Sequence, residues 1–259
     1  MINLKTKIWQ LENIETVLFD KDGTFLDLHY FWGKMTELRC KKVVETYNAD
    51  SKIVEELCIC LGYDTKKEKM LPDGITALYS RCEIIKMFKK DLQRFGIFAH
   101  EDELEEIFDK VSFDFYKDIS KYAKPIDEAI EFIKILHSNK IKMGIVTADS
   151  LKSTELTLKM FGWEKYFDCV IGRESSNETK ESGALTRLAL NKLNANPKTT
   201  VMIGDTPIDY QSAINANIEN VILVSTGQIP VQELQKYSKY CVESLAQIKT
   251  YCCVDNECL

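Results

Sequence analysis

Two pairs of aspartates follow short apolar runs at distant points of the sequence. Asp20 comes directly after "IETVLF" and Asp22 two residues later, whereas Asp205 follows "TVMIG" and precedes Asp209 by four residues. A carboxylate can attack phosphorus and form an aspartyl phosphate, while a second carboxylate moves the proton of the leaving group or of the attacking water. The pattern therefore predicts phosphoryl transfer, with Asp20 as the nucleophile and Asp22 as the acid and base.

Such a group of carboxylates needs positive charge, because its members repel one another and a phosphate. A hard cation with oxygen ligands meets this need, and Mg²⁺ is the usual partner of phosphate. We expect Asp20 and Asp205 to be direct ligands, with Asp209 holding a metal-bound water or orienting a ligand. Thr147 and neighbouring backbone N–H groups would bind phosphate oxygens, and Lys180 would neutralise charge in the transition state.

These residues must be positioned by the elements that precede them. Apolar, β-branched runs predict buried strands at 14–20, 142–147, 168–172, 200–205 and 220–225, with a shorter one near 241. Apolar spacing of three and four residues predicts helices at 127–139, 150–161, 182–193 and 209–216. This alternation predicts an α/β fold, a Rossmann-like, doubly wound parallel sheet. Ligands of such sheets bind outside the carboxyl ends of the strands, which is where the candidate residues stand.

Between the first and second strands the pattern changes, and no strand-like run is found. Helical spacing predicts an all-helical insertion with helices at 31–47, 51–61, 75–95 and 101–119. We therefore predict two domains, an α/β core formed by 1–29 and 123–259 and a helical domain formed by 30–122.

Four motifs resemble those of the haloacid dehalogenase-like superfamily of phosphotransferases. "LFDKDGTFLD" fits its DxDGT motif, "GIVTADS" its apolar strand ending in Ser or Thr, and "MIGDTPIDYQSAINAN" its GDxxxD motif. The remaining motif is a lysine commonly followed by proline, and in "ETKESGAL" Lys180 is followed by Glu181 instead. The likeness covers 14–29 and 123–245 and is greatest to the phosphoglycolate phosphatase-like branch with its helical cap.

The resemblance implies a Mg²⁺-dependent hydrolase of a small phosphorylated metabolite, with the helical insertion as a cap over the site. It implies metal binding by Asp20, Asp205 and the backbone carbonyl of Asp22, with Asp209 farther from the metal than these direct ligands. Substrate phosphate would be bound by Thr147, Ala148 and Lys180.

Other interpretations remain open at this point. A phosphomutase of the β-phosphoglucomutase type would use the same two aspartates, and a non-catalytic protein could bind Mg²⁺, phosphate or a partner without turnover. Asp22 argues against a C–halogen hydrolase, and the lack of membrane spans against an ion-pumping ATPase. In purely structural terms, Asp20 and Asp22 could form a turn, Thr147 could cap a strand, Lys180 could lie at the surface, and Asp209 could cap a helix.

Composition limits the remaining function classes. The 259 residues carry a net charge of −6, which disfavours nucleic-acid binding. There is no apolar run of about 18 residues and no signal peptide, so we expect no membrane association and a cytoplasmic location. The nine cysteines are then expected to be reduced, and the spacing of Cys241, Cys252, Cys253 and Cys258 fits no common zinc site. Neither the substrate nor the oligomeric state is indicated.

Overall fold

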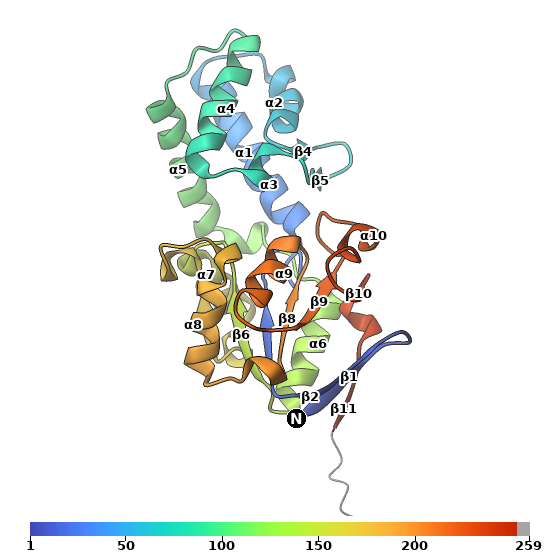
Figure 1. The fold of residues 1–259 in the computed structure, drawn as a ribbon. Helices are drawn as coiled ribbons and strands as arrows, with labels where there is room; N and C mark the ends of the chain where they lie inside the picture. The colour runs from blue at the N-terminus through green and yellow to red at the C-terminus, as the bar shows by residue number, and fades with distance from the viewer. Residues whose placement is uncertain (253–259) are drawn as a thin grey trace, which may run out of the picture. The chain divides into compact units, whose positions relative to one another are not determined.

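The computed structural model describes residues 1–252, which form two compact units. One unit combines Met1–Asp27 with the chain from Pro125 onwards, and the other is Leu28–Lys124 (Figure 1). The second unit is thus an insertion that follows the first strand of the large sheet. Each unit is described below by itself.

The first unit is built on a six-stranded parallel sheet, as the alternation of strands and helices predicted. Its central strands are wholly buried, because they are rich in Val, Ile, Leu, Met and Phe and are covered on both faces, whereas the edge strand at Tyr240–Val242 is only partly buried. In sheet order they are β10 (Tyr240–Val242), β9 (Asn220–Val224), β8 (Thr200–Gly204), β3 (Thr16–Phe19), β6 (Lys142–Val146) and β7 (Cys169–Ile171).

The order of the strands places a ligand crevice at the end of β3. Strand β3 pairs with β6 on one side and with β8 on the other, so that Thr16 lies between Lys142 and Thr200. The chain runs outward through β6 and β7 and then returns to β8, which makes the junction of β3 and β8 a topological switch point. The backbone N–H of Asp20 donates to the carbonyl of Ile203 at 2.8 Å and continues this pairing beyond the strand.

Helices cover the sheet, and local signals define their ends. Helix α7 begins after Ser150, whose side chain accepts the N–H of Ser153, and ends at Gly162 with a left-handed φ of 66°. No helix of residues 1–252 is long and apolar enough to span a bilayer. The helices of this unit are α6 (Asp127–Ser138), α7 (Leu151–Phe161), α8 (Ala184–Leu193), α9 (Pro207–Ile214) and α10 (Val231–Leu234).

A second, three-stranded antiparallel sheet in this unit was not predicted. It consists of β1 (Ile2–Lys5), β2 (Gln10–Ile14) and β11 (Lys249–Cys252), with β1 in the middle. Ile2 and Leu4 are buried whereas Asn3 and Lys5 are not, so the strand alternates with period two. The strands are short and half polar, which is why a search for continuous apolar runs missed them.

The inserted unit is a bundle of helices with its own core, in which Leu57, Phe88 and Phe108 are fully buried. The single helix predicted at 75–95 is wrong, because the chain is extended at Tyr79 and a new helix begins after Ser80 in a capping box with Glu83. The helices are α1 (Leu28–Thr46), α2 (Val54–Cys60), α3 (Ile75–Leu78), α4 (Arg81–Arg94) and α5 (Glu101–Lys117).

The inserted unit also contains a two-stranded ribbon, which the expectation of an all-helical insertion did not include. Strands β4 (Tyr63–Asp64) and β5 (Lys69–Met70) pair in antiparallel fashion. A Cβ at Gly33 of α1 would lie 2.3 Å from the ring of Tyr63, so the ribbon packs closely on that helix only because the residue is glycine. Strands of two residues are too short to leave a periodic signal in a sequence.

Candidate active site

Three buried aspartates meet at the switch point of the large sheet. Asp20 follows β3, Asp205 follows β8, and Asp209 lies in the first turn of α9. Each offers a carboxylate oxygen, and these oxygens all lie within 4.8 Å of one another. They converge because β3 and β8 are hydrogen-bonded neighbours, although the residues are far apart in sequence.

The ammonium group of Lys180 lies between two of these carboxylates. Its Nζ is 2.5 Å from Oδ1 of Asp20 and 2.5 Å from Oδ1 of Asp209. The side chain is buried, so the interpretation of Lys180 as a surface lysine is wrong. Lys180 opens a short 3-10 turn, Lys180–Ser182, and the side-chain amide of Asn215 donates to the carbonyl of Glu181 at 2.9 Å. This contact positions the turn without the proline that is common after such a lysine.

One cation does not balance three buried carboxylates, and the pKa values reflect this. Burial raises the pKa of Asp20 to about 7; the charge of Lys180 lowers it, whereas those of Asp209 and Asp22 raise it. Burial, followed by the charge of Asp20, also raises the pKa of Asp205 well above its ordinary value. For Lys180, burial alone would lower the pKa, but Asp20 and Asp209 raise it, so the lysine stays charged.

Two glycines allow the carboxylates to pack this closely. A Cβ at Gly227 would lie 1.8 Å from Oδ2 of Asp205, and a Cβ at Gly204 would lie 2.2 Å from Cγ of Asp209. Both oxygens of Asp209 are engaged, Oδ1 by Lys180 and Oδ2 by Thr206, with which Asp209 forms a capping box. Asp209 is therefore not itself the cap of α9, because Thr206 occupies that position.

The set of donors fits a divalent cation. Oδ1 of Asp205 is buried and has no hydrogen-bond partner among the described residues, an arrangement that is costly unless another group contacts the oxygen. Oxygen ligands and excess negative charge are what a hard cation requires. Within residues 1–252, this aspartate cluster is the grouping that could hold a metal. Of the cysteines considered for zinc, Cys253 and Cys258 lie outside the described residues.

A second buried ionic group lies beside the first and was only partly predicted. The side chain of Lys21 is fully buried, and its Nζ is 2.7 Å from Oδ1 of Asp22 and 3.0 Å from Oδ2 of Asp149. Burial alone would raise the pKa of Asp149, but the charge of Lys21 lowers it below its ordinary value. Asp149 was missed, although the lysine between the two aspartates of the first motif is a signal that a further carboxylate is needed.

The loop after β3 directs these side chains. Gly23 has a φ of 83°, which favours glycine, and the carbonyl of Lys21 accepts the N–H groups of Phe25 and Leu26 at 3.1 Å each. The hydroxyl of Thr226 donates to the carbonyl of Gly23 at 2.6 Å. The loop is thus a turn, as its composition suggested, and the turn presents Asp22 with 15% of its side chain exposed.

Thr147 and Ala148 follow β6, the other neighbour of β3. Thr147 is buried, its N–H donates to the carbonyl of Ile171 at 3.0 Å, and its Oγ1 accepts the N–H of Asp149 at 3.1 Å. Ala148 is exposed in the turn before α7. Thr147 therefore caps the strand end, a role that is compatible with hydrogen bonding to a phosphate at the same edge of the sheet.

Replacing Asp149 by Asn is expected to destabilise the fold by about 3 kcal/mol, because it removes a carboxylate that lies 3.0 Å from the buried ammonium group of Lys21. Asp149 and Asp22 hold the same ammonium group, so loss of the Asp149 carboxylate should also leave Asp22 less firmly positioned and lower turnover. Urea unfolding at neutral pH measures the first effect. The matched control is Asp127→Asn, an exposed position in the same unit. An Asp149 variant as stable as this control would show that Lys21 does not need its second carboxylate.

The family assignment agrees with this arrangement of strands and carboxylates. A family model described as haloacid dehalogenase-like hydrolase matches residues 14–217, which include all four candidate motifs. The chain belongs to the haloacid dehalogenase-like hydrolases. The resemblance of the motifs is thereby confirmed, and the protein is a hydrolase with the α/β fold of that family.

Individual haloacid dehalogenase-like proteins extend the comparison over most of the chain. Pyrophosphatase PpaX of Halalkalibacterium halodurans is 23% identical over 212 residues, covering 81% of this chain and 83% of its own. The phosphorylated carbohydrates phosphatase of Thermotoga maritima is 24% identical over 208 residues, with coverages of 80% and 84%. The crystal structure of a subfamily IA hydrolase from Geobacter sulfurreducens superposes with a TM-score of 0.63 at 16% identity, covering 91% of this chain and 94% of that one.

Proposed function

We propose that this hydrolase is a Mg²⁺-dependent phosphatase that cleaves small phosphomonoesters through an aspartyl phosphate on Asp20. The observation that carries the proposal is the buried carboxylate of Asp20 at the switch point, in contact with Lys180 and beside Asp205. A rigid carboxylate that faces both a cation and further acidic groups is suited to attack a phosphate rather than a neutral carbon.

Two displacements at phosphorus complete the proposed reaction. In the first, an oxygen of Asp20 bonds to phosphorus while the ester P–O bond breaks, and protonated Asp22 gives its proton to the departing alkoxide. In the second, water attacks the aspartyl phosphate, Asp22 takes a proton from it, and the bond between Asp20 and phosphorus breaks. The ion pair with Lys21 fixes the position of Asp22, which must first give a proton and then take one up.

The remaining residues would bind and orient the phosphate. Lys180 stays charged and lies beside Asp20, so it would offset negative charge on the phosphoryl oxygens. Thr147 and the N–H of Ala148 would donate hydrogen bonds from the end of β6. Mg²⁺ would be held by Asp20, Asp205 and the backbone carbonyl of Asp22, with Asp209 further out, and would supply charge neutralisation of the phosphate.

The names of the relatives support a small phosphorylated substrate. One is called a pyrophosphatase and another a phosphorylated carbohydrates phosphatase. The experiment is phosphate release from a panel containing pyrophosphate, sugar phosphates and phosphoglycolate, with and without Mg²⁺. Release that requires Mg²⁺ and is absent from an Asp20→Asn variant would support the proposal. A lack of release from every compound would contradict it and leave phosphosugar isomerisation as the next assay.

Stabilisation by Mg²⁺ should increase with pH. In the metal-free protein the pKa of Asp20 is raised to about 7, so the cluster favours the folded state at acidic pH, and this contribution is lost as the pH rises through about 7. Metal binding displaces these protons and therefore tightens as the pH rises. We expect Mg²⁺ to raise the melting temperature more at about pH 8 than at about pH 5. An equal increase at both values, or an unchanged increase in Asp205→Asn, would remove the cluster from the metal site.

A further inference from the structure

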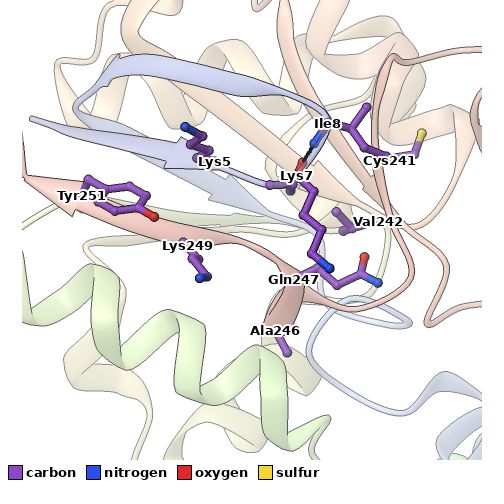
Figure 2. A pocket seen from close by; sticks show the side chains of 10 residues that line it. Lys5, Lys7, Ile8, Cys241, Val242, Ala246, Gln247, Lys249 and Tyr251 are labelled. Atoms are coloured by element: carbon purple, nitrogen blue, oxygen red, sulfur yellow. Dashed lines mark hydrogen bonds between the residues drawn. The ribbon is translucent and has the colours of Figure 1, made fainter.

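A basic pocket lies in the first unit, on residues outside the 14–217 match of the family model. It has a volume of about 550 Å³, within the usual size of small-molecule sites. Its walls come from the start of the chain and from the segment after residue 240. The lining residues are Lys5, Thr6, Lys7, Ile8, Cys241, Val242, Ala246, Gln247, Lys249 and Tyr251 (Figure 2).

The charge of the pocket has one sign. Lys5, Lys7 and Lys249 line it, no lining residue is acidic, and none of the three lysines forms an ion pair with a carboxylate of the described chain. Lys5 and Lys249 are directly opposed in the antiparallel pairing of β1 with β11. This pairing places two positive charges at one position of the sheet, and an anion bound there would offset their repulsion. This contrasts with the net charge of −6 for the whole chain.

Apolar side chains lie beside the lysines. Of the apolar lining residues, Val242 is buried, Ile8 has 88% of its surface exposed, and Tyr251 has 49% exposed. Lys7 extends from the loop between β1 and β2 toward Gln247, and Tyr251 lies on β11 at the other end (Figure 2). The pocket therefore offers an aromatic ring and aliphatic surface within the same space as three ammonium groups.

We propose that this pocket binds a small phosphorylated molecule that carries a ring, of the nucleotide class, at a place distinct from the aspartate cluster. The lysines would contact the phosphate, and the ring would cover Ile8 and Tyr251. The assignment rests on residues that the family match does not include, so it is independent of the reaction proposed above.

The test is calorimetric binding of AMP, ribose 5-phosphate, inorganic phosphate and adenosine to the full-length protein. All titrations use the Asp20→Asn variant without Mg²⁺, which keeps the aspartate cluster the same in every arm. We expect AMP to bind more tightly than ribose 5-phosphate or phosphate, and adenosine to bind least. In a Lys5→Gln/Lys249→Gln variant, AMP binding should weaken by about tenfold or more, because two ammonium contacts are lost. Both lysines are exposed, so circular dichroism should show an unchanged fold.

The matched control is Lys90→Gln/Lys198→Gln, which removes the same charge at exposed positions outside the pocket. It should bind AMP as tightly as the parent protein. Tryptophan fluorescence would also report binding at the pocket. Nε1 of Trp9 donates to the carbonyl of Cys241, a lining residue, at 3.4 Å. AMP should change tryptophan emission in the control and not in the pocket variant.

Three results would overturn the proposal. One is an absence of AMP binding to the parent protein, and a second is equal affinity of AMP for the pocket variant and the control. The third is adenosine binding as tightly as AMP, since the phosphate would then contribute nothing and the lysines would have no role.

Discussion

Replacement of Asp20 by Asn is expected to lower kcat/KM for phosphate release by at least about 10³-fold, because the amide keeps the shape of the side chain but cannot attack phosphorus. The fold should survive the change. The carboxylate is buried with a pKa raised to about 7, so its charged form costs stability at higher pH, and a neutral amide removes that cost. We therefore expect a melting temperature at about pH 8 that equals or exceeds that of the native protein.

Measuring both quantities separates chemistry from folding. The exposed Asp127→Asn variant should retain native turnover and native stability. If Asp20→Asn kept turnover within about tenfold of the native value, Asp20 would not be the nucleophile. A large fall in melting temperature would instead show that the carboxylate stabilises the fold, contrary to its raised pKa.

Replacement of Lys180 by Met is expected to affect both folding and turnover. The ammonium group contacts Asp20 and Asp209 at 2.5 Å each, and its loss leaves buried carboxylates without their cation. Breaking such a pair costs about 3–5 kcal/mol. Turnover should fall by about 10²-fold or more, because charge on the phosphoryl oxygens is no longer offset.

The pH dependence of this loss identifies its cause. Since Asp20 takes up a proton as the pH falls through about 7, the destabilisation of Lys180→Met should be smaller at about pH 5 than at about pH 8. The double variant Lys180→Met/Asp20→Asn should be destabilised less than Lys180→Met alone, which urea unfolding would measure as a coupling. Lys192→Met, at an exposed position, is the matched control. Additive effects in the double variant would exclude a direct interaction between the two side chains.

The sheet and the aspartate cluster could be predicted because each rests on a local signal. The run that forms β3 is apolar in three of its four residues, and Asp20 directly follows it. Once the strands are parallel, the residues at their carboxyl ends must gather at one edge. The pairing of β3 with β8, which brings Asp20 close to Asp205, follows from the order of the strands in the sheet.

Other features depend on contacts that no local pattern reveals. Asp149 becomes meaningful only when the buried ammonium of Lys21 is seen 3.0 Å from it. The small antiparallel sheet pairs the first residues with Lys249–Cys252, and neither segment has a sequence pattern that identifies the other as its partner. The basic pocket was missed for the same reason, since its lysines come from both ends of the described chain.

The position of β3 also has a consequence for synthesis on the ribosome. Strand β3 is synthesised early, yet its partners β6 and β8 begin at residues 142 and 200. The site around Asp20 therefore cannot form until most of the chain has been synthesised. The inserted unit, by contrast, closes its own core with residues between Leu28 and Phe108. We expect this bundle to fold first during translation, while the first strand remains unpaired. Long-range pairing of this kind is slow, and the unpaired apolar strand is prone to aggregation until β8 has been synthesised.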